Sequence, residues 1–143
     1  MLVVDTNILI YAAHSGSIHH AATTDWLAEA LSGREILGLP WAAVLGFVGI
    51  TTNPRVFPQP FSAEEALTAV EAWTTHPSVS TVEPTSRHLS VLGGLLRQSG
   101  TAGNLTTDAH IAALAIEHGA RVVSFDRDME RFGIEVVVPR ARA

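Results

Sequence analysis

The sequence alternates short apolar runs with longer segments in which apolar residues recur at helical spacing. The first run, Leu2–Val4, contains no polar residue, which is typical of a parallel strand that is buried on both faces. Further short runs, some of them more polar, occur at residues 35–39, 79–82, 121–125 and 135–138. Such alternation predicts βαβ units and an α/β fold. We therefore expect a three-layer α/β/α sandwich with a mostly parallel sheet of about five strands.

The segments between these runs carry signals for where helices begin and end. Ser62–Glu65 forms a capping box, so we expect a helix over residues 63–75. A second helix is expected over residues 86–99, and Gly100 is placed to end it. Three leucines of that helix are expected to face inward: Leu89, Leu92 and Leu96.

Length and composition limit the class of protein. A chain of 143 residues fits one domain, so we expect a single domain over residues 1–143. Apolar residues make up 47% of the chain, which indicates a globular and not a disordered protein. No apolar run approaches the roughly 20 residues that cross a bilayer, and Asp5 interrupts the apolar N-terminus, which argues against a signal peptide. We expect a cytoplasmic protein with no membrane association.

The basic residues exclude several classes of enzyme. All nine are arginine, and the net charge of −5 argues against a protein that coats nucleic acid, although a nuclease with a carboxylate pocket remains compatible. Asp126-Arg127-Asp128 superficially resembles the DxD of haloacid-dehalogenase-like phosphatases, and acidic strand ends are similar to those of receiver domains. Both families use a lysine, as does a P-loop, and this chain has none. The absence of cysteine also excludes disulfides and thiolate metal sites.

Two aspartates, Asp5 and Asp126, directly follow apolar strands. Parallel strands place their carboxyl ends at the same edge of a sheet, so these two side chains should lie close together. Asp108 lies in the first turn of a helix, and Asp128 follows Asp126 by two residues. Carboxylates gathered in this way repel one another, and a hard divalent cation relieves the repulsion; Mg²⁺ prefers oxygen ligands and Mn²⁺ accepts the same set. Such an ion activates water for attack on a phosphodiester.

Each of these aspartates also has a purely structural interpretation. An aspartate at the start of a helix accepts backbone N–H bonds and favours the positive end of the helix dipole. Taken one at a time, the residues leave capping and metal binding both open, and only the joint placement of Asp5 and Asp126 favours a shared site. His110 lies two residues past Asp108, about 200° around the helix, so we expect it to face away from the metal.

Three motifs, taken in order, resemble those of PIN-domain proteins. They are Asp5-Thr6-Asn7-Ile8-Leu9, Gly103–Ala113, and Ser124–Met129 followed by Arg131-Phe132. Their order and spacing, together with the chain length, resemble the VapC-type toxins of toxin–antitoxin operons. The segment Thr52–Phe57 is similar to one branch of that group. The resemblance covers essentially the whole chain.

The resemblance implies a metal-dependent endoribonuclease, a hydrolase of RNA phosphodiesters that acts as the toxin of a type II toxin–antitoxin pair. It also implies Mg²⁺ or Mn²⁺ as cofactor, a homodimer, and a small antitoxin whose tail occupies the active-site groove. The residues that it assigns to catalysis and metal binding are Asp5, Asp108 and Asp126, with Asp128 as a further ligand, direct or through water. The residues that it assigns to orienting these acids, for which turns or caps are an equally good account, are Thr6, Asn7, Asn104 and Ser124. The candidates for phosphate contacts, which flank the acids, are Arg127 and Arg131.

One departure from the family pattern concerns the helix after the second strand. The family usually places a glutamate there, whereas residues 41–50 of this chain contain no acid and Gly46 occupies the matching position. The missing acid motivates an alternative hypothesis, a catalytically weakened PIN-fold module that binds RNA or a partner.

Overall fold

The computed structural model describes residues 1–141 and contains a five-stranded sheet in the order β3-β2-β1-β4-β5. All four neighbouring pairs run parallel, which confirms the expected α/β architecture and strand number. The strands are β1 (Leu2–Val4), β2 (Leu37–Pro40), β3 (Val79–Val82), β4 (Arg121–Val123) and β5 (Val136–Val137). The more polar run at residues 79–82 lies at one edge, where only one side of the strand needs a partner.

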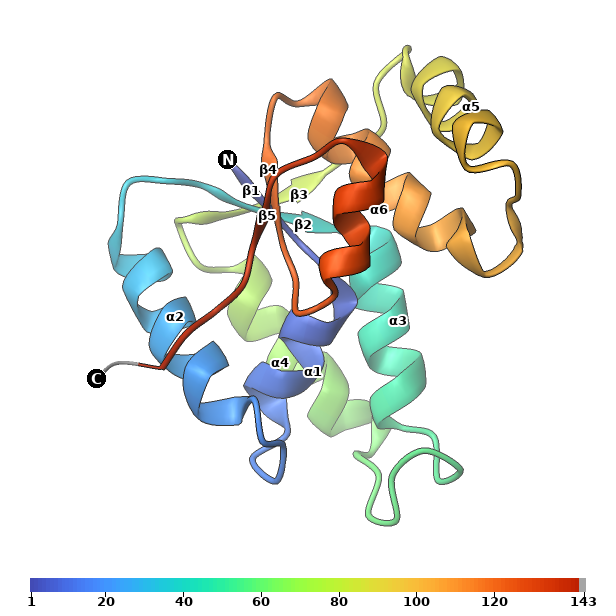
Figure 1. The fold of residues 1–143 in the computed structure, drawn as a ribbon. Coiled ribbons are helices and arrows are strands. Elements are labelled where there is room, and N and C mark those ends of the chain that lie inside the picture. Colours follow the sequence, from blue (N-terminus) through green and yellow to red (C-terminus); the bar gives the residue numbers. More distant parts are fainter. Residues whose placement is uncertain (142–143) are drawn as a thin grey trace.

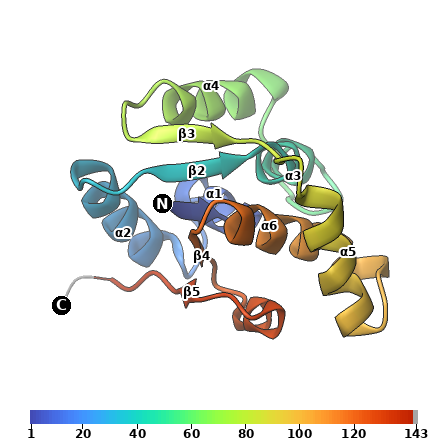
Figure 2. The same cartoon turned by 90° about the horizontal axis from the view of Figure 1, so that it is seen from above.

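Helices cover both faces of this sheet and complete the three layers (Figures 1 and 2). One face carries α1 (Thr6–Ala13), α2 (His20–Ser32), α3 (Trp41–Thr51) and α4 (Ala63–Thr74). The other carries α5 (His88–Ser99), α6 (Thr106–Glu117) and the 3₁₀ helix η2 (Arg127–Phe132), and a short 3₁₀ turn η1 (Gly103–Leu105) precedes α6.

Alternate residues of the strands point into the two cores, as the pleat requires. In β1, Leu2 and Val4 belong to the core shared with α1 and α3, whereas Val3 belongs to the core shared with α6. The central strand is therefore buried on both faces, which explains its unbroken apolar sequence.

The chain order places a topological switch beside β1. The chain first leaves β1 for β2 and β3 on one side, and later returns through α6 to β4 on the other side. In open parallel sheets, ligands bind in the crevice outside the carboxyl ends of strands at such a point. The fold therefore directs attention to the residues that immediately follow β1 and β4.

One packing expectation was wrong. Leu92 and Leu96 pack against the core as expected, but Leu89 is 81% exposed, and Leu95 is buried instead. The reason is that α5 begins at His88, which bonds to α6, so the inward face follows the spacing of His88, Leu92 and Leu95. The capping box at Ser62 and Glu65 and the left-handed stop at Gly100 (φ 75°) are confirmed.

Candidate active site

Asp5 is a buried carboxylate between the end of β1 and the start of α1. Its residue is only 5% exposed, and its backbone N–H bonds to the carbonyl of Val123 on the neighbouring strand (3.1 Å). Its Oδ1 accepts the backbone N–H of Thr6 (2.7 Å), so Asp5 does cap α1. Its Oδ2 accepts the hydroxyl of Ser124 (2.7 Å), a residue that follows β4. The two strand ends are thus joined through this carboxylate.

Asn7 and Ser124 extend the connection to Asp126. The amide nitrogen of Asn7 donates to Ser124 Oγ (3.0 Å), and its carbonyl oxygen accepts the backbone N–H of Phe125 (3.2 Å). Ser124 Oγ also accepts the backbone N–H of Asp126 (2.9 Å). These bonds fix the chain directly after β4, and the side chain of Asp126 in turn accepts the backbone N–H of Asp128 (2.9 Å).

An open hollow of about 330 Å³ lies beside these residues, and three aspartates from three elements line it: Asp5, Asp108 and Asp126. Asp108 arrives from the first turn of α6, on the other side of the sheet from α1. The structure therefore brings together the three acids singled out in the sequence. The remaining lining residues, most of them apolar and on α1 and α3, are Thr6, Asn7, Ile10, Ala42, Gly46, Ile50 and Thr107.

The three carboxylates interact electrostatically. Burial raises the pKa of Asp5, and the charge of Asp126 raises it further, although hydrogen bonds from Ser124 and Thr6 oppose the shift. Burial also raises the pKa of Asp108, as do the charges of Asp5 and Asp126, against a smaller opposing effect of Arg131. The charge of Asp126 therefore disfavours the ionised form of Asp5, and the charges of Asp5 and Asp126 disfavour that of Asp108, a situation that a bound cation would relieve.

Within residues 1–141, no group of three or more acidic or histidine side chains stands close enough together to hold a metal ion as it is. Both oxygens of Asp5 already accept hydrogen bonds, and so does Oδ1 of Asp126. The donor set nevertheless fits a hard divalent cation, because it consists of carboxylate oxygens around one hollow. Mg²⁺ usually retains several waters in proteins, so the carboxylates need not all contact it directly.

The other predicted site residues divide into two groups. Thr6 and Asn7 line the hollow, and Ser124, which has no exposed surface, donates to Asp5 and accepts the backbone N–H of Asp126. Asp128 is exposed on η2, and within residues 1–141 its one bond to the site is the backbone N–H that it donates to Asp126. Asn104 is exposed in η1, and the part of the chain that the structure describes shows no bond linking it to the acids.

Gly46 lines the hollow from α3, opposite the start of α1. A Cβ placed on Gly46 would lie 2.9 Å from Cγ2 and 3.2 Å from Oγ1 of Thr6. The side chain of Thr6 therefore fills the space into which a side chain at position 46 would begin. Gly46 therefore contributes no carboxylate to the hollow, and its lack of a side chain allows α3 to approach α1 closely. This contact joins two distant segments, so the sequence of α3 alone did not reveal it.

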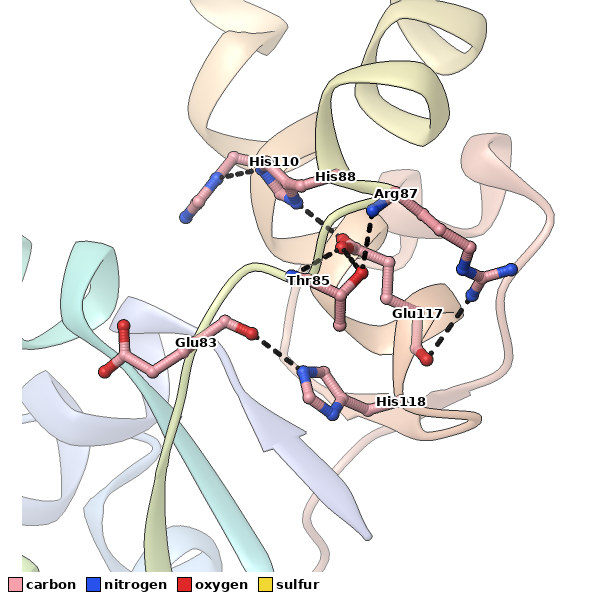
Figure 3. A network of polar contacts seen from close by, with 7 residues as sticks. All are labelled: Glu83, Thr85, Arg87, His88, His110, Glu117 and His118. Atoms are coloured by element: carbon pink, nitrogen blue, oxygen red, sulfur yellow. Dashed lines mark hydrogen bonds and ion pairs between the residues drawn. The ribbon is translucent and has the colours of Figure 1, made fainter.

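A second polar network lies at the far end of α6 (Figure 3). The side chain of Glu117 is fully buried and accepts two bonds from Thr85 (2.9 Å from N, 2.6 Å from Oγ1) and one contact from His88 Nδ1 (2.5 Å). His88 Nε2 lies 2.9 Å from His110 Nδ1, so His110 points toward α5, and its expected orientation away from Asp108 is confirmed. Burial alone would raise the pKa of Glu117, but the bonds from Thr85 and His88 outweigh it and lower that pKa.

This network fastens the connection between β3 and α5 to the last turn of α6, whose first turn carries Asp108. No sequence motif indicates this network, because its partners lie 22 to 32 residues apart along the chain. Its contribution is to hold α6 in place from the end opposite the acids.

Comparison with known proteins fits this geometry. The family model of the PIN domain matches residues 2–135. The chain belongs to the PIN-domain family. Ribonuclease VapC37 of Mycobacterium tuberculosis is 45% identical to this PIN domain over 132 residues, 92% of each chain. Ribonuclease VapC33 of the same species is 36% identical over 132 residues, again 92% of each chain.

Solved structures share the fold of this PIN domain at low sequence identity. The sarcin-ricin-loop-cleaving toxin VapC20 of Mycobacterium tuberculosis superposes with a TM-score of 0.71 at 18% identity, over 97% of this chain and 100% of that one. VapBC2 of Rickettsia felis, bound to a DNA fragment from its promoter, gives a TM-score of 0.71 at 16% identity, over 96% and 98% of the two chains.

None of the helices within residues 1–141 is long and apolar enough to cross a bilayer.

Proposed function

We propose that this PIN domain is a divalent-metal-dependent endoribonuclease that acts as the toxin of a type II toxin–antitoxin pair. The observation that carries the proposal is the meeting of Asp5, Asp108 and Asp126 around one hollow at the carboxyl ends of β1 and β4. The names of the relatives support an RNA substrate, because proteins 36% and 45% identical to this chain over 92% of its length are ribonucleases.

Mg²⁺ is the proposed cofactor, with Mn²⁺ as a substitute; when bound, such an ion supplies an activated water and neutralises charge at the phosphodiester. Hydrogen bonds within the chain hold two of the acids in position to bind this ion. Ser124 and Asn7 fix the carboxylate of Asp5 and the backbone of Asp126 by hydrogen bonds. Asp108 approaches from α6, and Asp128 is close enough in sequence to act through a water. Thr6 lines the hollow beside them.

The same proposal includes a protein partner. Ile10, Ala42 and Ile50 give the same hollow an apolar part of its lining, which offers a surface for the tail of a small antitoxin. Among the structural relatives, VapBC2 of Rickettsia felis and FitAB are described as bound to DNA fragments. We further propose a homodimer that acts in the cytoplasm. The alternative of a catalytically weakened binding module is not favoured, since the relatives carry the name ribonuclease.

The test is cleavage of RNA by purified protein after removal of divalent ions and their return. We expect no cleavage in EDTA, cleavage with Mg²⁺ or Mn²⁺, and loss of cleavage in Asp5→Asn, Asp108→Asn and Asp126→Asn with the fold intact by circular dichroism. Glu130→Gln, an exposed acid on η2 outside the hollow, is the control and should cleave as the wild type does. Full activity in all three aspartate variants, or RNA binding with no cleavage under any metal condition, would overturn the proposal.

A further inference from the structure

The 3₁₀ helix η2 presents three distinct faces, because residues three apart stack on one side of such a helix. Met129 and Phe132 form the inner face, with 1% and 5% of their surfaces exposed. Arg127 and Glu130 form a second face and pair with each other at 3.6 Å. The third face carries Asp128 and Arg131, which are both exposed. The two arginines that the sequence suggested for phosphate contacts therefore point in different directions.

Arg131 follows Asp126, which lines the acidic hollow, by five residues along the chain. Its charge lowers the pKa of Asp108, opposing burial and the two neighbouring acids, so the guanidinium is within electrostatic reach of that carboxylate. Within residues 1–141, Arg131 forms no hydrogen bond or ion pair, whereas Arg127 is paired with Glu130. An arginine that is close to an acidic site and has all its donors free is suited to bind a mobile anion.

A second hollow, of about 320 Å³, opens beside this arginine, between η2 and the end of α5. Its lining residues are Gln98, Ser99 and Arg131. The side-chain amide of Gln98 has no bonding partner among the described residues, and the hydroxyl of Ser99 donates to the carbonyl of Leu95 (3.0 Å). The hollow thus combines one free guanidinium with one free amide and contains no acid.

We propose that this second hollow binds a backbone phosphate of the RNA adjacent to the phosphate that is cleaved, with Arg131 as its main contact and Gln98 as a second donor. The inference rests on the proposed nuclease function and adds the direction in which the RNA strand crosses the protein. The RNA strand would run from the acids toward the end of α5. A chain with a net charge of −5 needs a local cation to hold a polyanion beside three carboxylates, and the charge of Arg131 acts on Asp108, one of the three.

The experiment compares Arg131→Gln with Arg127→Gln, which removes the same charge from the same short helix. Binding of a fluorescein-labelled single-stranded RNA is followed by anisotropy in EDTA over a range of salt concentrations, and KM and kcat for cleavage are measured with Mg²⁺. For Arg131→Gln we expect about tenfold weaker binding and a shallower slope of log Kd against log salt, by about 0.7. KM should rise more than kcat falls. Arg127→Gln should weaken binding less than Arg131→Gln does, because its guanidinium is paired with Glu130 and lines neither hollow.

Two further variants sharpen the result. Arg131→Lys keeps the charge and should recover the salt slope but only part of the affinity, since the bidentate geometry is lost. Gln98→Glu places a negative charge in the hollow and should weaken binding in the same direction as Arg131→Gln. Equal effects of the two arginine variants, or an unchanged salt slope in Arg131→Gln, would overturn the subsite while leaving the nuclease function standing. A wild-type protein that neither binds nor cleaves RNA would overturn both.

Discussion

Replacing Gly46 with alanine tests how closely α3 packs against the first turn of α1. The added Cβ would lie 2.9 Å from Cγ2 of Thr6, a distance that real Cβ contacts do not show, so Thr6 or the helix must move. Gly49 lies one turn later on the same helix and provides a matched control. A Cβ added there would meet nothing within 4 Å.

Two opposing effects set the size of the expected change. Alanine in place of glycine within a helix stabilises by about 0.5–1 kcal/mol. Forcing an extra methyl group into an already packed contact costs about 1–3 kcal/mol. Gly49→Ala should therefore raise the free energy of unfolding by about 0.5–1 kcal/mol. Gly46→Ala should lower the free energy of unfolding by about 1 kcal/mol, because the cost of overpacking exceeds the gain. In a Thr6→Ala background both contacting atoms are gone, so Gly46→Ala should become stabilising by about 0.5–1 kcal/mol.

Urea unfolding of the four variants Gly46→Ala, Gly49→Ala, Thr6→Ala and Thr6→Ala/Gly46→Ala measures these terms as a double-mutant cycle. The coupling between positions 6 and 46 should amount to at least about 1 kcal/mol. Equal stabilisation by Gly46→Ala and Gly49→Ala would show that Thr6 does not fill this space. The result also bears on Gly46→Glu, whose Cβ meets the same obstacle: the family glutamate cannot simply be restored here without displacing Thr6 from the hollow.

Three further predictions concern charge. Glu117→Gln should lose about 2 kcal/mol at neutral pH, because a fully buried carboxylate loses charged hydrogen bonds, whereas the exposed Glu130→Gln should lose less than about 0.5 kcal/mol. Since folding lowers the pKa of Glu117, its stabilising effect is complete at neutral pH and declines as acid protonates it, so the gap between wild type and Glu117→Gln should narrow on acidification. In EDTA, Asp108→Asn should have a higher Tm than the wild type, because it removes a carboxylate whose ionised form burial and the neighbouring acids disfavour. Adding Mg²⁺ should raise the Tm of this variant less than that of the wild type. A Tm below that of the wild type in EDTA would contradict the reasoning. The raised pKa values of Asp5 and Asp108 predict that calorimetric Mg²⁺ affinity falls as pH drops, starting above the ordinary aspartate range, and an affinity independent of pH would refute it.

The fold was predictable because it depends on patterns that are local in sequence. Continuous apolar runs identified the buried strands, and the capping box at Ser62 and Glu65 and the stop at Gly100 marked helix ends correctly. The meeting of Asp5 and Asp126 followed from the parallel sheet alone, since both follow strands that are neighbours in it. Asp108 needed the family motif, because nothing in its own helix shows that its first turn reaches the other two acids.

The remaining features depend on contacts between distant segments. The inward face of α5 is set by the bond of His88 to His110, and the apolar spacing of its leucines therefore gave the wrong answer for Leu89. The contact of Gly46 with Thr6 joins two helices. The difference between Arg127 and Arg131 depends on η2 having three residues per turn, which the sequence does not specify.

The sequence left two interpretations of the strand-ending aspartates open, capping and metal binding, and the structure indicates why they need not compete. Asp5 caps α1 through Oδ1, and Asp126 accepts the N–H of Asp128 at the start of η2. These bonds restrict the rotation of both side chains, so the cap itself holds each carboxylate at the edge of the hollow. Asp108 makes no such bond within residues 1–141, and the repulsion that it feels from the other two is not offset by a cap. The two capped acids are thus held by hydrogen bonds, and Asp108 is the acid of the three that no side-chain hydrogen bond within residues 1–141 holds in place.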